Sequence, residues 1–193
     1  MNDARERLVA VYDANILYSA VLCDLFLRVA TAGLVRAHWT DQIHEEWIRA
    51  VLRRRTDLSR DQLTRRRDAM DRAVPGALVT DFEHLVPALE LPDPEDRHVL
   101  AAAIVAGAQV IVTKNTKDFP AAVLDPRGVV ARGPDGFLLE LFSTRHEEML
   151  QAVADHRRSL VSPSRGVDEH LDTYRRNELP TFADALAAYR DRV

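Results

Sequence analysis

The run LVAVYD at residues 8–13 decides the fold, because five apolar residues rich in β-formers lead directly into an acid, Asp13. A short, continuous apolar run predicts a strand buried on both faces, which is typical of parallel sheets. The run VIVT at residues 110–113 has the same character and leads into a polar loop, KNTKD at 114–118. Apolar residues at helical spacing lie between the two runs, and this alternation predicts an α/β fold with a central parallel sheet.

Other signals along the chain fill in the remaining elements. Residues 34–39 and 128–131 predict two more short strands, and the stretch SRDQ at 59–62 is a capping box that predicts a helix start. The stretch PDPED at 92–96 predicts a second start, with a capping acid, proline in the first turn and further acids there. Beyond residue 142 only helical patterns follow. We therefore expect one domain over residues 8–142 and a helical C-terminal extension over 143–193.

The composition excludes several classes of protein. The 193 residues suffice for one domain with an appendage, and 26 basic against 30 acidic residues exclude a chain that wraps nucleic acid by its overall positive charge. A single cysteine, Cys23, excludes a disulfide framework and a cysteine-rich zinc module, and we expect it in the core. No apolar run approaches the roughly 18 residues of a membrane helix, and the charged N-terminus is unlike a secretory signal. We expect a cytoplasmic protein without membrane contact.

Positive charge is concentrated in one segment of this acidic chain. Residues 49–72 contain nine arginines and four aspartates. Such asymmetry suits a protein that binds a polyanion beside an acidic body, although a solvated helical hairpin explains it equally well. Under the first interpretation the phosphate contacts come from five arginines: Arg53, Arg54, Arg65, Arg66 and Arg67.

Acidic and amide side chains follow the predicted strands at the points where the strands end. Asp13 follows the first strand, whereas Asn115 and Asp118 lie in the loop after the strand at 110–113. Ligands of open parallel sheets bind at the carboxyl ends of the strands. Asp96 lies in the first turn of the helix that leads to the second of these strands, and Glu46 lies beside the apolar face of its own helix. The five side chains converge if the two strands are neighbours.

Several carboxylates without basic partners repel one another, and a hard divalent cation resolves this repulsion. Oxygen ligands select Mg²⁺ or Mn²⁺ over zinc, and such a cation favours hydrolysis of a phosphodiester. Each residue also has a purely structural interpretation. Asp96 stabilises a helix N-terminus, Asn115 and Asp118 form turns, and Glu46 belongs to a solvated helix face.

Three motifs carry a resemblance to a known family. They are VYDANIL at 11–17, DPEDRHVLAAA at 93–103 and VTKNTKDFP at 112–120, with Glu46 between the first two. In this order and spacing they resemble the PIN domain over residues 8–142, in particular the VapC-like toxins of toxin–antitoxin pairs. The resemblance implies a three-layer α/β/α fold, Mg²⁺- or Mn²⁺-dependent endoribonuclease activity on RNA, frequent homodimers and inhibition by a small cognate antitoxin.

The resemblance also implies roles for individual residues. Asp13, Glu46 and Asp96 match the first three acids of the family and would bind the metal, with Glu46 preferred to Glu45 because an apolar residue follows it. The fourth acid is Asn115 here, with Asp118 three residues later, and either residue would complete the site. Two supporting residues follow from the same motifs: Asn15, which would brace the first acid, and Thr113, a positioning hydroxyl.

The same residues argue against two other functions. A haloacid-dehalogenase-like phosphatase requires a second aspartate where the chain has Asn15, and the HEEWI stretch at 44–48 lacks the second histidine of a zinc helix. His98 is expected to be a core or surface residue rather than a ligand. Because Asn115 replaces an acid, a catalytically silent PIN domain that binds RNA or protein remains the alternative function.

Overall fold

The structure is a computed structural model that describes residues 7–160 and 166–193. Its sheet contains four strands, all parallel, in the order β2-β1-β3-β4. Their bounds are β1 (Leu8–Tyr12), β2 (Val35–His38), β3 (Val110–Val112) and β4 (Val130–Arg132). The register pairs Ala10 with Val110 and Tyr12 with Val112. The two strands that precede the predicted acids are therefore neighbours.

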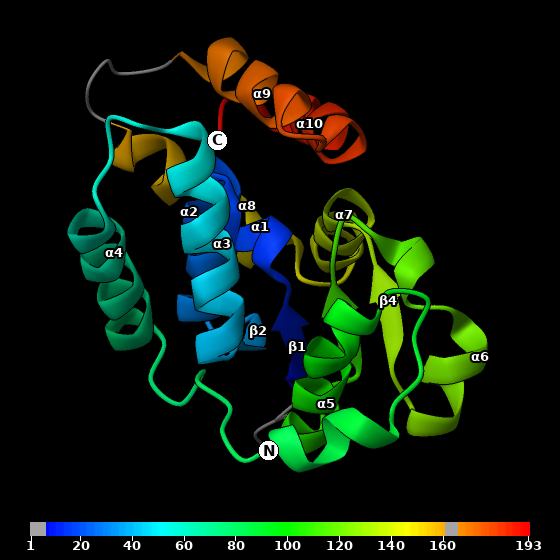
Figure 1. Ribbon diagram of the computed structural model, residues 1–193. Coiled ribbons are helices and arrows are strands. Elements are labelled where there is room, and N and C mark those ends of the chain that lie inside the picture. Colours follow the sequence, from blue (N-terminus) through cyan, green and yellow to red (C-terminus); the bar gives the residue numbers. More distant parts are fainter. Residues whose placement is uncertain (1–6, 161–165) are drawn as a thin grey trace.

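Helices cover both faces of the sheet, which confirms the expected three-layer α/β/α arrangement (Figure 1). Helix α5 packs against β1 and β3, whereas α2 packs against β2. On the α2 side, the Tyr12 ring meets Phe26 of α2 with centroids 5.0 Å apart and Phe137 of α7 at 6.5 Å. The α-helices are α1 (Ala14–Tyr18), α2 (Ala20–Thr31), α3 (Asp41–Arg54), α4 (Arg60–Ala73), α5 (Arg97–Ala106), α6 (Ala121–Leu124), α7 (Pro134–Thr144), α8 (His146–Ser159), α9 (Val167–Arg176) and α10 (Pro180–Leu186).

Short 3₁₀ turns complete the described chain: η1 (Glu83–Ala88), η2 (Pro94–Asp96), η3 (Thr116–Asp118), η4 (Asp125–Arg127) and η5 (Ala187–Tyr189). Local sequence explains several of these boundaries. Ser59 and Gln62 form the predicted capping box of α4. The helix start predicted over 92–96 is the 3₁₀ turn η2, which leads into α5. Asp93 caps this turn by accepting a hydrogen bond from the Glu95 N–H. Gly107 ends α5 with φ +63°, which glycine adopts readily.

Ser19 divides one helical stretch of the sequence into two helices. The apolar residues from Ile16 to Leu27 follow a helical pattern, and the structure forms α1 and α2 from this stretch, on either side of Ser19. Ser19 has an extended backbone, with φ −72° and ψ 126°, and its hydroxyl accepts from the Leu22 N–H. A serine at this point competes with the helix by capping the next one. Helix α1 is consequently a single short turn placed directly after Asp13.

The C-terminal helices are packed onto the PIN-like body rather than separated from it. Helix α8 packs against α2 and α7, and α10 packs against α7 and α9. Figure 1 shows α9 and α10 beyond α1, on the side where β1 ends. The domain boundary expected between residues 142 and 143 stays a prediction, and α7 runs across that point. Among the described residues, no helix combines the length and apolar character needed to cross a bilayer.

Candidate active site

Asp13 is held in place by three short hydrogen bonds at the end of β1. Its Oδ1 accepts from the Ala14 N–H at 2.6 Å, and its Oδ2 accepts from the Asn15 amide at 2.6 Å and the Thr113 hydroxyl at 2.7 Å. The side chain is 5% exposed. Three accepted bonds leave about one of the four lone-pair positions of a carboxylate free. Burial raises the pKa of Asp13, and the hydrogen bonds from Thr113 and Ala14 oppose that rise.

Thr113 and Asn15 connect the ends of β1 and β3. The Thr113 hydroxyl also accepts from the Asn15 amide and the Asn115 N–H, each at 3.0 Å. The Lys114 N–H donates to Asn15 Oδ1 at 3.0 Å. The loop after β3 is thereby tied to Asp13 through two side chains. A methyl group in place of either polar side chain leaves these buried partners unsatisfied.

Asp96 carries the least satisfied charge of this region. Its Oδ2 is buried and has no hydrogen-bond partner within the described part of the chain. Burial raises the pKa of Asp96 to about 7, and the negative charges of Asp13, Asp93 and Asp118 add to the rise. An acid in this condition is destabilised until a proton or a cation neutralises it.

Glu46 faces the same region from α3, where His98 of α5 binds it. The distance from His98 Nε2 to Glu46 Oε1 is 2.8 Å, with the histidine 3% exposed and the glutamate 25%. Of the two expected positions for His98, core or surface, the structure shows the core, and the buried ring also orients Glu46. The neighbouring Glu45 instead pairs with Arg60 at 2.9 Å on the surface.

A cavity of about 770 Å³ joins these side chains and is called the acid cavity below. Asp13, Asn15, Glu46, Asp96 and Asn115 line it, together with seven further residues: Ala14, Tyr18, Trp47, Ala50, Arg53, Arg54 and Lys114. Of the two candidates for the fourth position, Asn115 lines the cavity and Asp118 does not. Asp118 lies in η3 and acts on Asp96 through its charge.

The five arginines predicted to contact RNA lie in different surroundings in the structure. Arg53 and Arg54, at the end of α3, are exposed and line the acid cavity. Arg66 donates to the Leu17 carbonyl at 2.7 Å and lies 4.7 Å from the centroid of the Trp47 ring. Arg67 pairs with Asp68 at 2.8 Å, and Arg65 is exposed on α4. The geometry favours Arg53 and Arg54 as phosphate contacts, and the assignment of all five stays a prediction.

The donor set is compatible with a hard divalent cation. Asp13, Asp96, Glu46 and Asn115 offer oxygen atoms to one cavity, and Asp96 Oδ2 has no hydrogen-bond partner among the described residues. Over residues 7–160 and 166–193, no three His, Cys, Asp or Glu side chains are arranged to hold a metal by themselves. Mg²⁺ in proteins commonly binds one or two carboxylates and retains several waters, rather than sitting in a cage made of protein ligands alone. The carboxylates of Asp13 and Asp96 fit this mode of binding.

Sequence reasoning did not assign five residues of the acid cavity to the site. Ala14 and Lys114 lie within the recognised motifs and Tyr18 follows the first motif, whereas Trp47 was used only to choose Glu46, and Ala50 lies one helical turn from Glu46. The helical spacing from Glu46 to Ala50 and Arg53 is a signal that places all three on one face of α3.

Comparison with known proteins agrees with this geometry. A family model described as PIN domain matches residues 9–117, more than half of the chain, and one described as VapC50 C-terminal domain matches residues 134–188. The relative named "Putative ribonuclease VapC50", from Mycobacterium tuberculosis (strain ATCC 25618 / H37Rv), is 49% identical over 59 residues. This match covers 31% of the chain and about a third of the relative, 34% of its length. No solved structure gives a match.

The matched region contains Asp13, Glu46, Asp96 and Asn115, the polar residues that the parallel sheet and α3 bring to one cavity. The C-terminal match begins at the first residue of α7 and extends to η5. The chain belongs to the PIN-domain family, with a C-terminal region similar to that of VapC50.

Proposed function

We propose that this protein is an Mg²⁺- or Mn²⁺-dependent endoribonuclease and the toxin of a toxin–antitoxin pair. The observation that carries the proposal is the buried, unpartnered oxygen of Asp96 in a cavity that also contains Asp13. Two carboxylates with pKa values raised by burial make a poor structural pair and a suitable cation site. The name of the VapC50 relative supports ribonuclease activity.

In this proposal, Asp13 and Asp96 bind the cation, and Glu46 binds it directly or through water. A bound divalent cation would make water a better nucleophile and offset the negative charge that develops at phosphorus. Thr113 and Asn15 fix the orientation of Asp13, and His98 fixes that of Glu46. Arg53 and Arg54 bind phosphates of the RNA strand at the rim of the cavity. Asn115 contributes a neutral oxygen where other family members have an acid.

Two partners belong to the same proposal. A cognate antitoxin would bind at the acid cavity and block access of RNA, and a second copy of the chain would form a homodimer. Both partners come from the family resemblance.

A catalytically silent PIN domain that binds RNA or protein is the second candidate. The specific observation in its favour is Asn115, which removes one negative charge from the cavity lining. Fewer charges weaken the attraction for a divalent cation. The silent domain would retain the arginines at the rim and bind RNA without cutting it.

One experiment separates the two functions. The purified chain, free of antitoxin, is incubated with total RNA in Mg²⁺, in Mn²⁺ and in chelator, beside the Asp13→Asn variant. We expect discrete fragments that require metal and are absent with the variant, while circular dichroism shows both proteins folded. RNA that stays intact with either metal, despite binding to the folded wild-type chain, would support the silent domain instead.

A further inference from the structure

The turn between α9 and α10 reaches the acid cavity. The Ser19 hydroxyl donates to Asn177 Oδ1 at 2.7 Å, which places this turn against the junction of α1 and α2. One residue later, Glu178 pairs with Lys114, with Oε1 to Nζ at 3.1 Å. Lys114 lines the cavity. The turn between the C-terminal helices thus brings the Glu178 carboxylate to the ammonium group of Lys114, a residue of the candidate active site.

The backbone at Glu178 makes the choice of this residue informative. Glu178 has φ +65°, and two hydrogen bonds close a Schellman motif around it: the Leu179 N–H donates to the Tyr174 carbonyl at 3.0 Å, and the Glu178 N–H donates to the Arg175 carbonyl at 3.1 Å. Glycine is the usual residue at this left-handed position, where a side chain is strained. The turn geometry therefore does not explain the glutamate, and strained backbone of this kind often accompanies a functional side chain.

The basic side chains that line the acid cavity differ in their ion-pair partners. Arg53, Arg54 and Lys114 line it, and among the described residues an ion pair is recorded for Lys114 alone. The main chain of Lys114 is also bound to Asn15, which holds Asp13. The ammonium group therefore extends from a fixed point beside the acids. Its side chain is 24% exposed, and that of Glu178 is 68% exposed, so water reaches the ion pair.

We propose that Lys114 binds a phosphate of the RNA backbone beside the acids and that Glu178 occupies its ammonium group in the absence of RNA. The Glu178 carboxylate then competes with the substrate phosphate for the Lys114 ammonium group. A solvent-exposed ion pair is weak, so RNA displaces Glu178 at a small cost. The C-terminal helices would lower the affinity for RNA in this way and favour strands that make enough other contacts. The inference rests on the proposed function, since RNA is the polyanion concerned.

The test measures affinity for RNA separately from cleavage. A labelled single-stranded RNA is titrated with the full chain in chelator, at several salt concentrations, so that no cutting interferes. Glu178→Gln removes the charge and leaves the turn otherwise unchanged. We expect it to raise the affinity about two- to fivefold at low salt, which is the size of a weak exposed ion pair. Lys114→Gln should lower the affinity, and adding Glu178→Gln to it should have no further effect.

A second pair of variants separates charge from backbone strain. Glu178→Gly should raise both the melting temperature and the affinity for RNA, because it relieves the positive φ and frees Lys114. Asp81 has φ +62° and does not line the acid cavity, so Asp81→Gly should raise the melting temperature and leave the affinity unchanged.

The outcomes distinguish this inference from the proposed function. Equal RNA affinities of the wild type and Glu178→Gln overturn the inference, even if metal-dependent cleavage is observed. A gain in affinity that persists in the Lys114→Gln background also overturns it. If the gain depends on Lys114 while no metal produces cleavage, the inference stands and the nuclease assignment fails. Absence of RNA binding by every variant overturns the inference, and the cleavage assay with metal then decides the nuclease assignment.

Discussion

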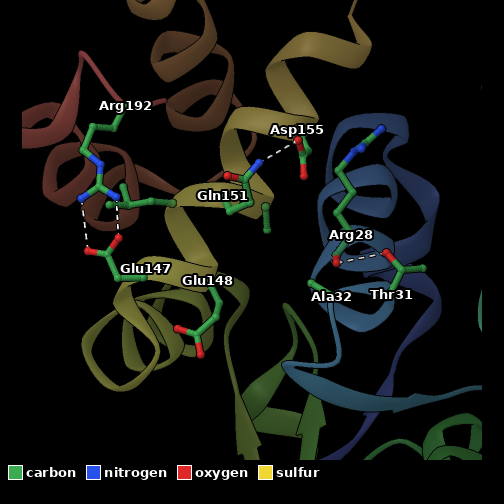
Figure 2. A pocket seen from close by; sticks show the side chains of 10 residues that line it. Arg28, Thr31, Ala32, Glu147, Glu148, Gln151, Asp155 and Arg192 are labelled. Carbon is green, nitrogen blue, oxygen red and sulfur yellow. Dashed lines mark hydrogen bonds and ion pairs between the residues drawn. The ribbon is translucent and has the colours of Figure 1, made fainter.

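Two cavities of the same volume, about 770 Å³, show why size alone does not identify the active site. The second, called the α2–α8 cavity here, is lined by residues of α2 and α8 and by Arg192. Figure 2 shows Arg192 meeting Glu147 and Gln151 meeting Asp155 in it. Its carboxylates are bound by donors: Arg192 lowers the pKa of Glu147, and Arg158 lowers that of Asp155.

The acid cavity has the opposite electrostatics. Burial raises the pKa values of Asp13 and Asp96, and Asp96 has an oxygen without a partner among the described residues. Paired charges on the surface add little to stability and demand nothing further. A half-buried acid with an unpartnered oxygen, such as Asp96 beside the buried Asp13, costs stability until a cation or a proton neutralises it. This difference supports the acid cavity as the site of the proposed activity, and the predictions below test it.

The largest expected effect comes from neutralising one acid in each cavity. Asp96→Asn should lower metal-dependent RNA cleavage by about 10³-fold, because it removes a charged cation ligand and the transition-state stabilisation that the cation supplies. Asp155→Asn, in the α2–α8 cavity, is the matched control and should cut at the wild-type rate. Initial rates on a labelled RNA measure both. Similar losses in the two variants would remove the distinction between the cavities.

The next effect concerns the two adjacent glutamates of α3. Glu46→Gln should reduce cleavage by about 10- to 100-fold, the usual range for residues that hold or orient metal ligands. Glu45→Gln should have little effect, because Glu45 pairs with Arg60 outside the acid cavity. His98→Gln should lower kcat more than it raises KM, since the ring orients Glu46. A greater loss with Glu45→Gln than with Glu46→Gln would reverse the assignment.

Stability should respond to pH with opposite signs in the two cavities. The pKa of Asp96 rises from its ordinary 3.8 to about 7, so the stability contributed by its proton is complete below pH 3.8 and lost as pH rises through 7. Without metal, Asp96→Asn should therefore raise the free energy of unfolding at pH 8 by about 1–2 kcal/mol, after allowance for solvent screening of a half-buried group. The gain should vanish at pH 3.

Glu147 supplies the opposite case for this measurement. Arg192 lowers its pKa, so its contribution is present above the ordinary value of 4.5 and lost as pH falls through the lowered value. Glu147→Gln should consequently destabilise the chain slightly at pH 8 and leave it unchanged at low pH. Urea unfolding at pH 3 and pH 8 checks both variants. A destabilised Asp96→Asn protein at pH 8 would show that the acid is satisfied in solution.

The sequence predicted the contacts that follow from the order of the strands. It did not predict contacts between side chains on separate helices or turns that are far apart along the chain. Asp13 and Asn115 were placed correctly near each other because each follows a buried parallel strand, and β1 and β3 proved to be neighbours. The partner of Glu46 was missed because His98 is 52 positions away on another helix, and a helix pattern does not specify a facing residue. Lys114 and Glu178 meet across an even longer separation, through a turn that no motif marks.

The smallest expected effect concerns the arginines, whose clustering in the sequence does not distinguish two roles. Arg53→Gln and Arg54→Gln should each weaken RNA binding a few-fold. Each should also reduce the magnitude of the slope of log affinity against log salt concentration by about 1, because each removes one phosphate contact at the rim of the cavity. Arg66→Gln should instead lower the melting temperature, since Arg66 binds the Leu17 carbonyl and lies over Trp47. Titrations at several salt concentrations, beside thermal melts, separate the roles. An Arg66→Gln protein of normal stability with a reduced salt slope would extend the RNA surface from α3 onto α4.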